Sequence, residues 1–504
     1  MKTNKYYDEA VDEIIKLVKE RNISNKNELY NVKKEVCQKY NIPNIISDSA
    51  LVLKSGMQVF SRKLSRRLSG VTVIAVMTSP AKCPHGKCVF CPGGVEFMTP
   101  QSYTGREPAA LRGAMNDYDA YSQVKSRLSQ YKSLGQTPSK IDLIIMGGTF
   151  THRTYSYQEK FITDCLRALN NKKNGGLKAM QELNEHAFSR CVGLTIETRP
   201  DEINKKTVSR LLKLGVTRVE LGVQSVDNNV LSKSNRGHTV GDVVRATKML
   251  KDAGFKINYH MMTNMPGSTI KKDLESFTTV FEDNRFKPDM VKIYPTLLIK
   301  GTKLYDMYLR KEWMPYSLND TIKIIARIKR LIPPYVRVMR IQRDIPSYLI
   351  EQDLKNSNLR ELVKDYMNRE GWFCRCIRCR EAGRNNGEIA KAHIKKIKYE
   401  ASLGTEYFIE YVDEKEVLFG FLRLRIMKDK CFVRELHVYG EQVPVGGEPV
   451  IQHTGIGRLL MSTAEGIVRK NKLSKLHVIS GVGVRGYYRK LGYYLENNYM
   501  VKKL

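Results

Sequence analysis

The alternation of apolar and polar positions predicts a repeated strand–helix order in the middle of the chain. From about residue 71 to about residue 345, short apolar runs rich in β-branched residues alternate with longer helical stretches. This order is typical of a parallel sheet covered by helices, open or closed as a barrel, with its chemistry at the carboxyl ends of the strands. The expected strands are Val71–Met77, Ile141–Met146, Val192–Glu197, Arg218–Gln224, Lys256–Met262, Met290–Tyr294 and Tyr335–Arg340.

The amino-terminal 70 residues have a different pattern. Apolar residues such as Ala10, Ile14 and Val18 recur at helical spacing and predict helices. Near the end of this region a group of basic residues falls on adjacent turns and would form a positive ridge. Such a ridge is either a solvated helix face or a surface that contacts phosphates. Its members are Arg62, Lys63, Arg66 and Arg67.

The carboxyl-terminal part predicts a second, smaller α/β domain. A Cys- and Arg-rich connector occupies residues 346 to 395, and alternating strands follow it. A glycine-rich turn, a helix, a further strand at Leu476–Ile479 and a Tyr-rich end complete the region. The chain therefore divides into four expected regions, 1–70, 71–345, 346–395 and 396–504, which agrees with a prior of about three domains for this length.

Charge suggests the kind of partner. The 504 residues include 85 Lys and Arg against 52 Asp and Glu, for a formal charge of +33, while the apolar fraction of 42% is normal for a globular protein. A charge this far from zero favours polyanions, so nucleic acid is the first candidate partner and an anionic membrane surface the second. Residues 1–20 lack the apolar core of a signal peptide, and the longest apolar runs are far shorter than the roughly 20 residues of a spanning helix. We expect a cytoplasmic protein without a membrane segment.

Six of the ten cysteines form two tight groups. Tight groups in a cytoplasmic chain indicate metal sites before disulfides. The remaining four are expected to be buried as small apolar side chains. The first group is Cys83, Cys88 and Cys91, the second is Cys374, Cys376 and Cys379, and the single residues are Cys37, Cys165, Cys191 and Cys431.

The first cysteine group follows a predicted strand with the spacing C-x4-C-x2-C. A structural zinc ion requires four protein ligands, and this segment offers only three thiolates. His85 is an alternative zinc ligand in the same segment. A cluster held by three thiolates leaves one iron open to an exogenous ligand. This arrangement at the first strand of a βα fold resembles the radical S-adenosylmethionine superfamily, although its commonest spacing has one residue fewer between the first two cysteines.

Later strand ends support that resemblance. Gly147 and Gly148 resemble the glycine-rich strand end where backbone carbonyls meet the methionine amino group of S-adenosylmethionine, because glycine permits a close backbone approach. Thr149 stands where an acidic residue is customary. Glu197, Arg199 and Gln224 follow at positions that would contact the ribose and the carboxylate of that cofactor.

The second domain carries a Q-x-x-G-x-G motif at a strand-to-helix junction. The motif resembles the pyrophosphate loop of GNAT-type acetyltransferases, in which backbone amides and a helix N-terminus bind acetyl-CoA. The preceding strand and two tyrosines after it lie where that family places the acetyl group and a tyrosine near the thioester, and core packing is the alternative for the tyrosines. The motif residues are Gln452, Gly455, Ile456 and Gly457, the strand residues are Glu435, Leu436, His437 and Val438, and the tyrosines are Tyr487 and Tyr488.

The second cysteine group, C-x-C-x-x-C, suits a structural zinc that stabilises a connector too short to form its own core. A fourth ligand is not evident, and His393 and Cys37 are candidates. An unmetallated Cys-rich turn is the alternative.

Both domains on one chain resemble the catalytic subunit of Elongator, the family that carboxymethylates the wobble uridine of tRNA, in its single-chain archaeal or bacterial form. Distinctive strings carry the resemblance over nearly the whole chain, at Cys88–Gly94, Met146–Phe150, Glu197–Asp201, Glu220–Ser225, Glu435–Gly440, Gln452–Met461 and Ile479–Gly492. The first cysteine loop is shorter here than in many members, which affects its conformation and not its ligand count.

The resemblance implies a joint mechanism. A [4Fe-4S] cluster on Cys83, Cys88 and Cys91 would cleave S-adenosylmethionine, and the adenosyl radical would take hydrogen from the acetyl methyl of acetyl-CoA. The resulting carbon radical would add to carbon 5 of the uridine, and hydrolysis would leave a carboxymethyl group. Family contacts to acetyl-CoA also map onto Lys140, which would let one ligand bridge both domains.

The resemblance further implies tRNA, acetyl-CoA and an electron donor as partners, and the sequence is compatible with a homodimer. Radical chemistry is reasonable because carbon 5 of uracil is a poor electrophile, so the cofactor carries the hard step. Two alternatives remain open. One is protein lysine acetylation with a structural iron–sulfur domain, and the other is a non-catalytic tRNA-binding scaffold with acetyl-CoA as a ligand. The charge of +33 is poorly matched to basic protein tails.

Overall fold

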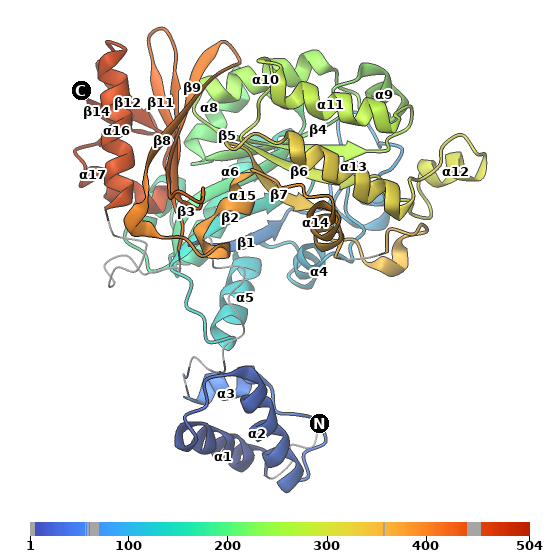
Figure 1. Cartoon of the computed structure of the whole chain (residues 1–504), viewed down its shortest axis with the longest axis vertical. Coiled ribbons are helices and arrows are strands. Elements are labelled where there is room, and N and C mark those ends of the chain that lie inside the picture. Colours follow the sequence, from blue (N-terminus) through green and yellow to red (C-terminus); the bar gives the residue numbers. More distant parts are fainter. Residues whose placement is uncertain (1–5, 56, 58–59, 61–69, 356–357, 441–454) are drawn as a thin grey trace.

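The computed structural model describes residues 6–55, 57, 60, 70–355, 358–440 and 455–504. It contains a helical amino-terminal unit and two seven-stranded sheets with their helices (Figure 1). The predicted basic ridge at Arg62, Lys63, Arg66 and Arg67 lies outside the described residues, as does Gln452.

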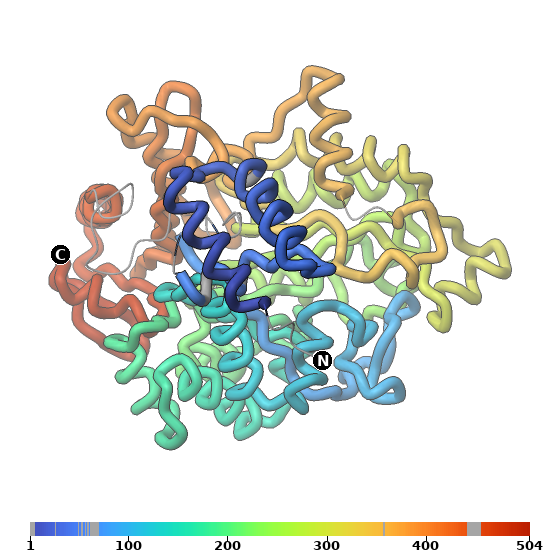
Figure 2. The backbone as a smooth tube through the Cα atoms, turned by 90° about the horizontal axis from the view of Figure 1, so that it is seen from below, coloured from blue at the N-terminus to red at the C-terminus, as the bar shows by residue number. Residues whose placement is uncertain are grey.

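The amino-terminal helices are α1 (Tyr7–Glu20), α2 (Lys26–Lys39) and α3 (Asp48–Ser55). They pack on a small apolar core of their own, which includes Ile14, Val18, Leu29 and Val36. Residues 6–57 contain eight basic and eight acidic residues, so the helices expected to be basic are neutral. The positive charge of the predicted 1–70 region lies mainly after them in the sequence. In the view from below, these helices lie in front of the two sheets (Figure 2).

The first sheet is entirely parallel and keeps the order of the chain, β1-β2-β3-β4-β5-β6-β7. A parallel sheet in sequential order requires a crossover after every strand, and right-handed crossovers place the helices on one side of it. The predicted strands are confirmed within about three residues at each end. The observed strands are β1 (Thr72–Met77), β2 (Lys140–Met146), β3 (Arg190–Thr198), β4 (Arg218–Gln224), β5 (Lys256–Thr263), β6 (Met290–Pro295) and β7 (Arg337–Ile341).

Helices cover the outer side of this sheet and form the largest core of the molecule with it. The sheet is therefore a partial barrel. The helices of this part are α4 (Pro108–Met115), α5 (Ala120–Ser133), α6 (Tyr155–Leu169), α7 (Leu177–Asn184), α8 (Lys205–Lys213), α9 (Asn228–Lys233), α10 (Val240–Asp252), α11 (Ile270–Glu282), α12 (Lys303–Leu309), α13 (Leu318–Leu331), α14 (Leu359–Arg369) and α15 (Ile377–Arg380).

The second sheet is mixed, in the order β13-β14-β12-β11-β10-β9-β8, and α16 packs on β9, β10 and β11. It begins at His393, inside the region predicted as connector, because β8 pairs with β9 along its whole length. Its elements are β8 (His393–Ala401), β9 (Gly404–Val412), β10 (Leu418–Ile426), β11 (Cys431–Val438), α16 (Ile456–Lys470), β12 (Lys475–Val478), α17 (Arg485–Arg489), β13 (Tyr494–Glu496) and β14 (Tyr499–Lys503).

Buried charges join the two sheets. Arg434 of β11 donates hydrogen bonds of 2.8 Å to the carboxylate of Asp289 and to the carbonyl of Phe255, the residues just before β6 and β5. Arg423 of β10 donates to the carbonyl of Tyr335, just before β7, at 2.7 Å. The second sheet therefore lies against the amino-terminal ends of the first sheet's strands, opposite the edge where the first cysteine group follows β1.

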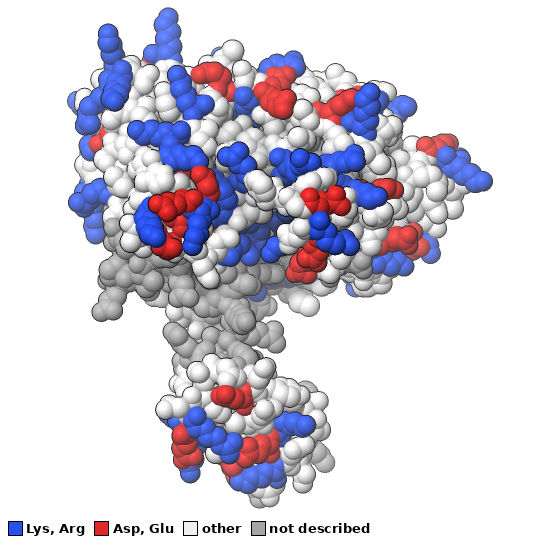
Figure 3. Space-filling view, viewed as in Figure 1, with Lys and Arg blue, Asp and Glu red and all other residues white. Residues whose placement is uncertain are grey.

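The surface carries many more Lys and Arg than Asp and Glu, and in one view basic side chains are spread over both sheet regions (Figure 3). The edge strand β8 exposes Lys396 and Lys398. Lysine on an edge strand also discourages pairing with a second chain. This distribution is a broad basic surface, as a polyanion requires.

Candidate active site

The first cysteine group lies on the loop after β1, folded against the carboxyl ends of the neighbouring strands. Cys88 and Cys91 are buried, and Cys83 is partly buried. Donors point at the sulfurs: Arg236 Nη1 lies 3.0 Å from Cys88 Sγ, and the backbone N–H of Ser102 lies 3.3 Å from Cys91 Sγ. Hydrogen bonds of this kind stabilise thiolates and tune the clusters that they hold.

The geometry of this loop fits a cluster better than a single zinc ion. In the described part of the chain, neither the three thiols nor the thiols with His85 form a set whose ligand atoms all lie within 4.8 Å. A single zinc ion is coordinated by ligand atoms at the corners of one small tetrahedron, whereas the cysteines of an iron–sulfur cluster bind different iron atoms and lie further apart. His85 instead contacts Cys88 Sγ at 3.1 Å, and burial together with Arg199 and Arg236 lowers the pKa of His85 to about 3. The residues present therefore fit a [4Fe-4S] cluster on three cysteines.

The glycine pair after β2 lies beneath this loop. Gly147 has φ +131°, and a Cβ there would lie 2.0 Å from Thr78 Oγ1. Gly148 has φ +94°, and its Cβ would lie 3.2 Å from the carbonyl of Gln101 in the cysteine loop. Both positions therefore require glycine, and Thr149 Oγ1 reaches Cys83 Sγ at 3.5 Å.

The other residues predicted for S-adenosylmethionine lie around the same loop. Arg199 binds Asp201 through two hydrogen bonds of 3.0 and 2.8 Å, donates to the carbonyl of Arg236 at 2.6 Å and contacts His85 Nδ1. Gln224 has φ +69°, and its Oε1 is buried and meets no hydrogen-bond partner among the described residues. Arg199 is thus committed to holding the loop, whereas Gln224 keeps an acceptor for a ligand.

Glu197 leads into a group of charged residues that sequence reasoning did not predict. It accepts a hydrogen bond of 2.8 Å from the hydroxyl of Tyr103, a residue of the cysteine loop. Its Oε1 lies 3.8 Å from Nζ of Lys292, which also forms a close ion pair with Glu220. His260 Nε2 contacts Glu220 at 2.8 Å. In the sequence, Glu220, His260 and Lys292 each stand out as a charged or polar residue in the interior of an otherwise apolar strand.

The charge states of this group follow from its contacts. Burial alone would raise the pKa of Glu220, but Lys292 and His260 outweigh burial and lower it well below its usual range. Burial opposes the charge of Lys292, yet Glu220 and Glu197 raise the pKa of its ammonium. Burial and Lys292 lower the pKa of His260, which leaves a neutral imidazole. Glu220 is therefore a carboxylate and Lys292 an ammonium.

A second candidate site lies where β11 and β12 diverge. β12 pairs only with Phe432 and Val433 among the residues of β11, so the strands separate beside Leu436. The amino-terminal end of α16 faces this gap, with Gly455 at φ +90° as its N-cap. A Cβ on Gly457 would lie 2.6 Å from the hydroxyl of Tyr487 and 3.9 Å from Leu436. A glycine N-terminus of a 15-residue helix beside an open strand suits a diphosphate ligand.

The structure separates the two predicted tyrosines. Tyr487 is 39% exposed beside Gly457, whereas Tyr488 is 6% exposed and packs between Tyr487 and Tyr493 in the domain core. The burial of Tyr488 agrees with core packing, the alternative for the tyrosines, and its catalytic role stays a prediction. Ile456 is likewise buried in this core.

The strand residues predicted for acetyl-CoA also differ in role. Glu435 ion-pairs with Arg423 at 2.8 Å, so its side chain belongs to the junction between the sheets. His437 stacks on Phe421, with ring centroids 5.9 Å apart, and lies close to Tyr439. Leu436 and Val438 are partly buried and pack against the apolar core of the second domain. The strand would therefore offer a ligand mainly its backbone.

Lys140, the first residue of β2, lies near the same junction. It is partly buried, and burial lowers its pKa to about 8. Its register partner on β3 is Arg190, and Gly483 of the second domain packs so closely on Arg190 that an added Cβ would lie 2.6 Å from Arg190 Cβ. A residue of the first sheet thus lies beside the loop that leads to Tyr487.

The second cysteine group is brought together as a zinc site requires. The sulfur atoms of Cys374, Cys376 and Cys379 all lie within 4.8 Å of one another. No His, Cys, Asp or Glu elsewhere in the described residues joins this set. Cys37 is excluded as a fourth ligand because it is buried in the helical unit, with Ile46 N 3.4 Å from its sulfur. His393 is exposed at the start of β8 and lies outside the set.

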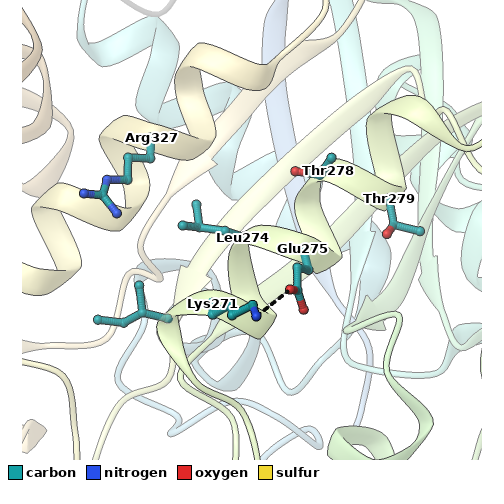
Figure 4. A pocket seen from close by; sticks show the side chains of 7 residues that line it. Lys271, Leu274, Glu275, Thr278, Thr279 and Arg327 are labelled. Carbon is teal, nitrogen blue, oxygen red and sulfur yellow. Dashed lines mark ion pairs between the residues drawn. The ribbon is translucent and has the colours of Figure 1, made fainter.

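The four single cysteines are buried, as predicted. A separate surface depression between α11 and α13 is lined by Lys271, Leu274, Glu275 and Arg327 (Figure 4). It has none of the predicted chemistry, and Lys271 and Glu275 form an exposed ion pair there. Among the described residues, no helix has the length and apolarity needed to cross a bilayer.

Comparisons with known proteins agree with this architecture. Residues 77–278 match the Radical SAM superfamily, and residues 288–369 match the Radical SAM C-terminal domain. The chain is 45% identical to tRNA uridine(34) acetyltransferase of Methanocaldococcus infernus over 98% of both chains. It is 40% identical to human Elongator complex protein 3, over 98% of this chain and 97% of the human one.

A solved structure agrees as well. The archaeal Elp3 of Methanocaldococcus infernus, with residues 1–46 deleted, superposes with a TM-score of 0.77 at 43% identity. The match covers 87% of this chain and all of that one. Both the resemblance drawn from the sequence and the predicted α/β fold class are confirmed. The chain belongs to the radical SAM family of tRNA uridine(34) acetyltransferases and Elongator complex protein 3.

Proposed function

We propose that this enzyme uses S-adenosylmethionine and acetyl-CoA to place a carboxymethyl group on carbon 5 of the wobble uridine of tRNA. The observation that carries the proposal is the junction of the two sheets. The gap beside Gly457 and Tyr487 belongs to a domain that packs on the amino-terminal ends of β5, β6 and β7, and Cys83, Cys88 and Cys91 lie on the loop that follows β1 of the same sheet. Both candidate sites therefore border the same sheet, the cysteine loop at its carboxyl edge and the second domain at its amino-terminal edge.

The first sheet would provide the binding sites for the cluster and for S-adenosylmethionine. Cys83, Cys88 and Cys91 would hold a [4Fe-4S] cluster, which supplies the electron that cleaves S-adenosylmethionine. Gly147, Gly148 and the Gln224 amide oxygen would receive that cofactor beneath the loop. An external electron donor would reduce the cluster again.

Acetyl-CoA would bind in the gap of the second domain. The backbone at Gly455 and Gly457 would accept the diphosphate at the start of α16. Tyr487 would lie beside the thioester, and Lys140 would contact the ligand from the first sheet. Gly481 packs so tightly on β3 that an added Cβ would lie 2.2 Å from the carbonyl of Val192, so the second domain contacts the first sheet close to the register partner of Lys140.

The tRNA would bind the broad basic surface, with Arg62, Lys63, Arg66 and Arg67 contributing phosphate contacts. The group of Cys374, Cys376 and Cys379 would hold a structural zinc. The three sulfur atoms lie close together, and hydrogen bonds from Cys374 and Cys379 lower the pKa of Cys376 well below its usual range. Both observations support a thiolate metal site.

The test is mass spectrometry of tRNA nucleosides after anaerobic incubation with S-adenosylmethionine, acetyl-CoA and a reductant. We expect carboxymethyluridine that requires all three reagents and disappears in Cys88→Ser, while tRNA binding persists. Acetylation of lysine peptides as fast as acetyl-CoA is consumed with tRNA would contradict the proposal. Retention of product after all three cysteines of the first group become serine would favour a scaffold.

A further inference from the structure

The polar contacts of the three cysteines in the first group are unequal. Cys83 Sγ meets a threonine hydroxyl at 3.5 Å, and Cys91 Sγ accepts from a backbone N–H at 3.3 Å. Both of these donors are neutral. Among the described residues, Cys88 alone accepts a hydrogen bond from a charged group, because Arg236 Nη1 lies 3.0 Å from its sulfur. One of the three sulfurs therefore lies in a different electrostatic environment from the other two.

Arg236 is a buried cation without a carboxylate partner. It is 6% exposed, and it forms no ion pair with any of the described residues. Its Nη2 donates to the carbonyl of Gly222 at 2.7 Å, and its Nε is buried and meets no acceptor in the described part of the chain. A buried charge without a counter-charge is costly. The guanidinium is therefore placed to face an anion, and the sulfur of Cys88 lies in that direction.

The surrounding backbone holds Arg236 in this position. Its N–H donates to the carbonyl of Leu231 in α9 at 3.0 Å, and its own carbonyl accepts from Arg199 Nη1 at 2.6 Å. Gly222 of β4 leaves room for the guanidinium, because an added Cβ there would lie 3.1 Å from Arg236 Nη2. The charge is thus fixed by two elements that pack against the cysteine loop, and it needs no rearrangement to interact with a bound cluster.

His85 supplies a second donor to Cys88, and Arg199 fixes the tautomer of its ring. His85 Nδ1 contacts Arg199 Nη1. A guanidinium can only donate, so Nδ1 accepts and the ring proton lies on Nε2. His85 Nε2–H therefore donates to Cys88 Sγ, 3.1 Å away. Asp201 ion-pairs with Arg199 at 2.8 Å and balances its charge. The unbalanced charge beside Cys88 is consequently that of Arg236.

The sign of the effect follows from the charge of the cluster. A [4Fe-4S] core bound by three thiolates is anionic, and its reduction adds one electron and no proton. A neighbouring cation stabilises the more negative state more strongly and so favours reduction. Water does not screen this interaction, because Arg236 is buried. Neutral N–H donors to sulfur act in the same direction with a smaller effect.

We propose that Arg236 raises the reduction potential of the cluster at Cys83, Cys88 and Cys91, by donating to Cys88 and by holding an unbalanced positive charge beside it. The inference rests on the proposed function, from which it takes the cluster, and adds the residue that makes the cluster easier to reduce. The electron comes from the external one-electron donor, which is oxidised as the cluster is reduced. Arg236 and His85 are positioning residues, because both act through Cys88 and not on the substrate.

A redox titration followed by electron paramagnetic resonance measures this potential without turnover. The full chain carrying its cluster is titrated anaerobically, without S-adenosylmethionine or tRNA, and the signal of the reduced cluster is recorded. We expect Arg236→Met to lower the ratio of reduced to oxidised cluster about tenfold at a given potential, because a charge-assisted hydrogen bond is lost. For one electron this is a shift of about 59 mV to a more negative potential. Arg236→Lys keeps the charge and should show a smaller shift.

Lys87→Met is the matched control. Lys87 precedes Cys88 directly in the chain, but its charge is paired with Glu96 at 2.5 Å and its side chain is 29% exposed. Water and the carboxylate weaken its effect on the cluster, so this variant should keep the potential of the unmodified protein. Pulsed electron paramagnetic resonance with isotopically labelled arginine gives a second readout. We expect a weak coupling between the reduced cluster and an arginine nitrogen that Lys87→Met retains and Arg236→Met loses.

The outcomes separate this inference from the proposed function. A potential for Arg236→Met equal to that of Lys87→Met overturns the inference, and so does a nitrogen coupling that Arg236→Met retains. Iron and sulfide analysis identifies a variant that has lost its cluster. Arg236→Gln, which keeps an N–H donor without the charge, then decides by the same shift, and loss of the cluster from this variant as well would make Arg236 a structural residue. Absence of iron and sulfide from the unmodified protein would count against the proposed function instead.

Discussion

Asp289 is the residue on which the junction between the two sheets depends most. It is 0% exposed and accepts hydrogen bonds from Arg434, while Arg423 and Lys251 lie 3.7 and 3.9 Å from its Oδ1. Asp289→Asn keeps the shape and removes the charge. Four buried cations, Arg423, Arg425, Arg434 and Lys251, would then share fewer carboxylates.

Removing one partner of a buried ion pair costs about 3–5 kcal/mol because the other charge stays buried and uncompensated. That is a large part of the roughly 5–15 kcal/mol that stabilises a typical domain. At about 2–4 °C per kcal/mol, the thermal midpoint should fall by at least about 6 °C. Differential scanning calorimetry at neutral pH measures the change, with Glu275→Gln on the exposed Lys271 pair as control.

A second substitution distinguishes the charge argument from a loss of packing. Lys251 is 0% exposed between Asp289 and Glu406, so Lys251→Met removes one of the surplus cations. We expect the double variant to be more stable than Asp289→Asn alone, by more than about 1 kcal/mol. A midpoint for Asp289→Asn equal to that of the control, or a double variant with strictly additive losses, would refute the reasoning.

Three further predictions concern the candidate sites. Gly147→Ala should abolish binding of S-adenosylmethionine in titration calorimetry and lower stability by about 1–3 kcal/mol, because alanine would be strained at φ +131° and would clash with Thr78. Gly176→Ala is the control, because an added Cβ there meets no atom of the described residues within 4 Å, and equal behaviour of the two variants would disprove the clash. The Cys376→Ser variant should lose its bound zinc, as measured by elemental analysis, whereas the Cys37→Ser variant should keep it. An unchanged zinc content in both variants would show that the metal lies elsewhere. The affinity for acetyl-CoA should fall as the pH rises through about 8, where Lys140 loses its proton, because only the ammonium attracts the phosphates of the ligand. The Lys140→Met variant should bind acetyl-CoA more weakly and show no such pH dependence. A pH dependence that survives in this variant would exclude Lys140 as its cause.

Much of the architecture could be predicted from the sequence because the strands of a parallel sheet are buried on the helix side and contain β-branched residues. The predicted Arg218–Gln224 agrees with β4 at both ends. The cysteine groups were visible because their spacing is local. The neutral charge of the amino-terminal helices is hidden in the net charge of the chain, because a basic run follows these helices closely in the sequence.

The buried charged group of Glu197, Glu220, His260 and Lys292 and the junction between the sheets could not be predicted in the same way. Glu220 and Lys292 are 72 residues apart, and only the order of the strands brings them together. Arg434 and Asp289 meet between two domains, 145 residues apart. In the sequence each is one charged residue next to a strand or within it. Their partners depend on register and on domain packing, which a hydrophobic pattern does not specify.

The central claim is that the acetyl group bound by the second domain meets the radical chemistry of the first. Anaerobic incubation with trideuterioacetyl-CoA, S-adenosylmethionine, a reductant and tRNA tests it most directly, with mass spectrometry of the 5′-deoxyadenosine formed. The account predicts one deuterium transferred to 5′-deoxyadenosine and carboxymethyluridine that retains the other two. Unlabelled 5′-deoxyadenosine beside labelled carboxymethyluridine would contradict it, because the acetyl methyl would then not be the hydrogen donor.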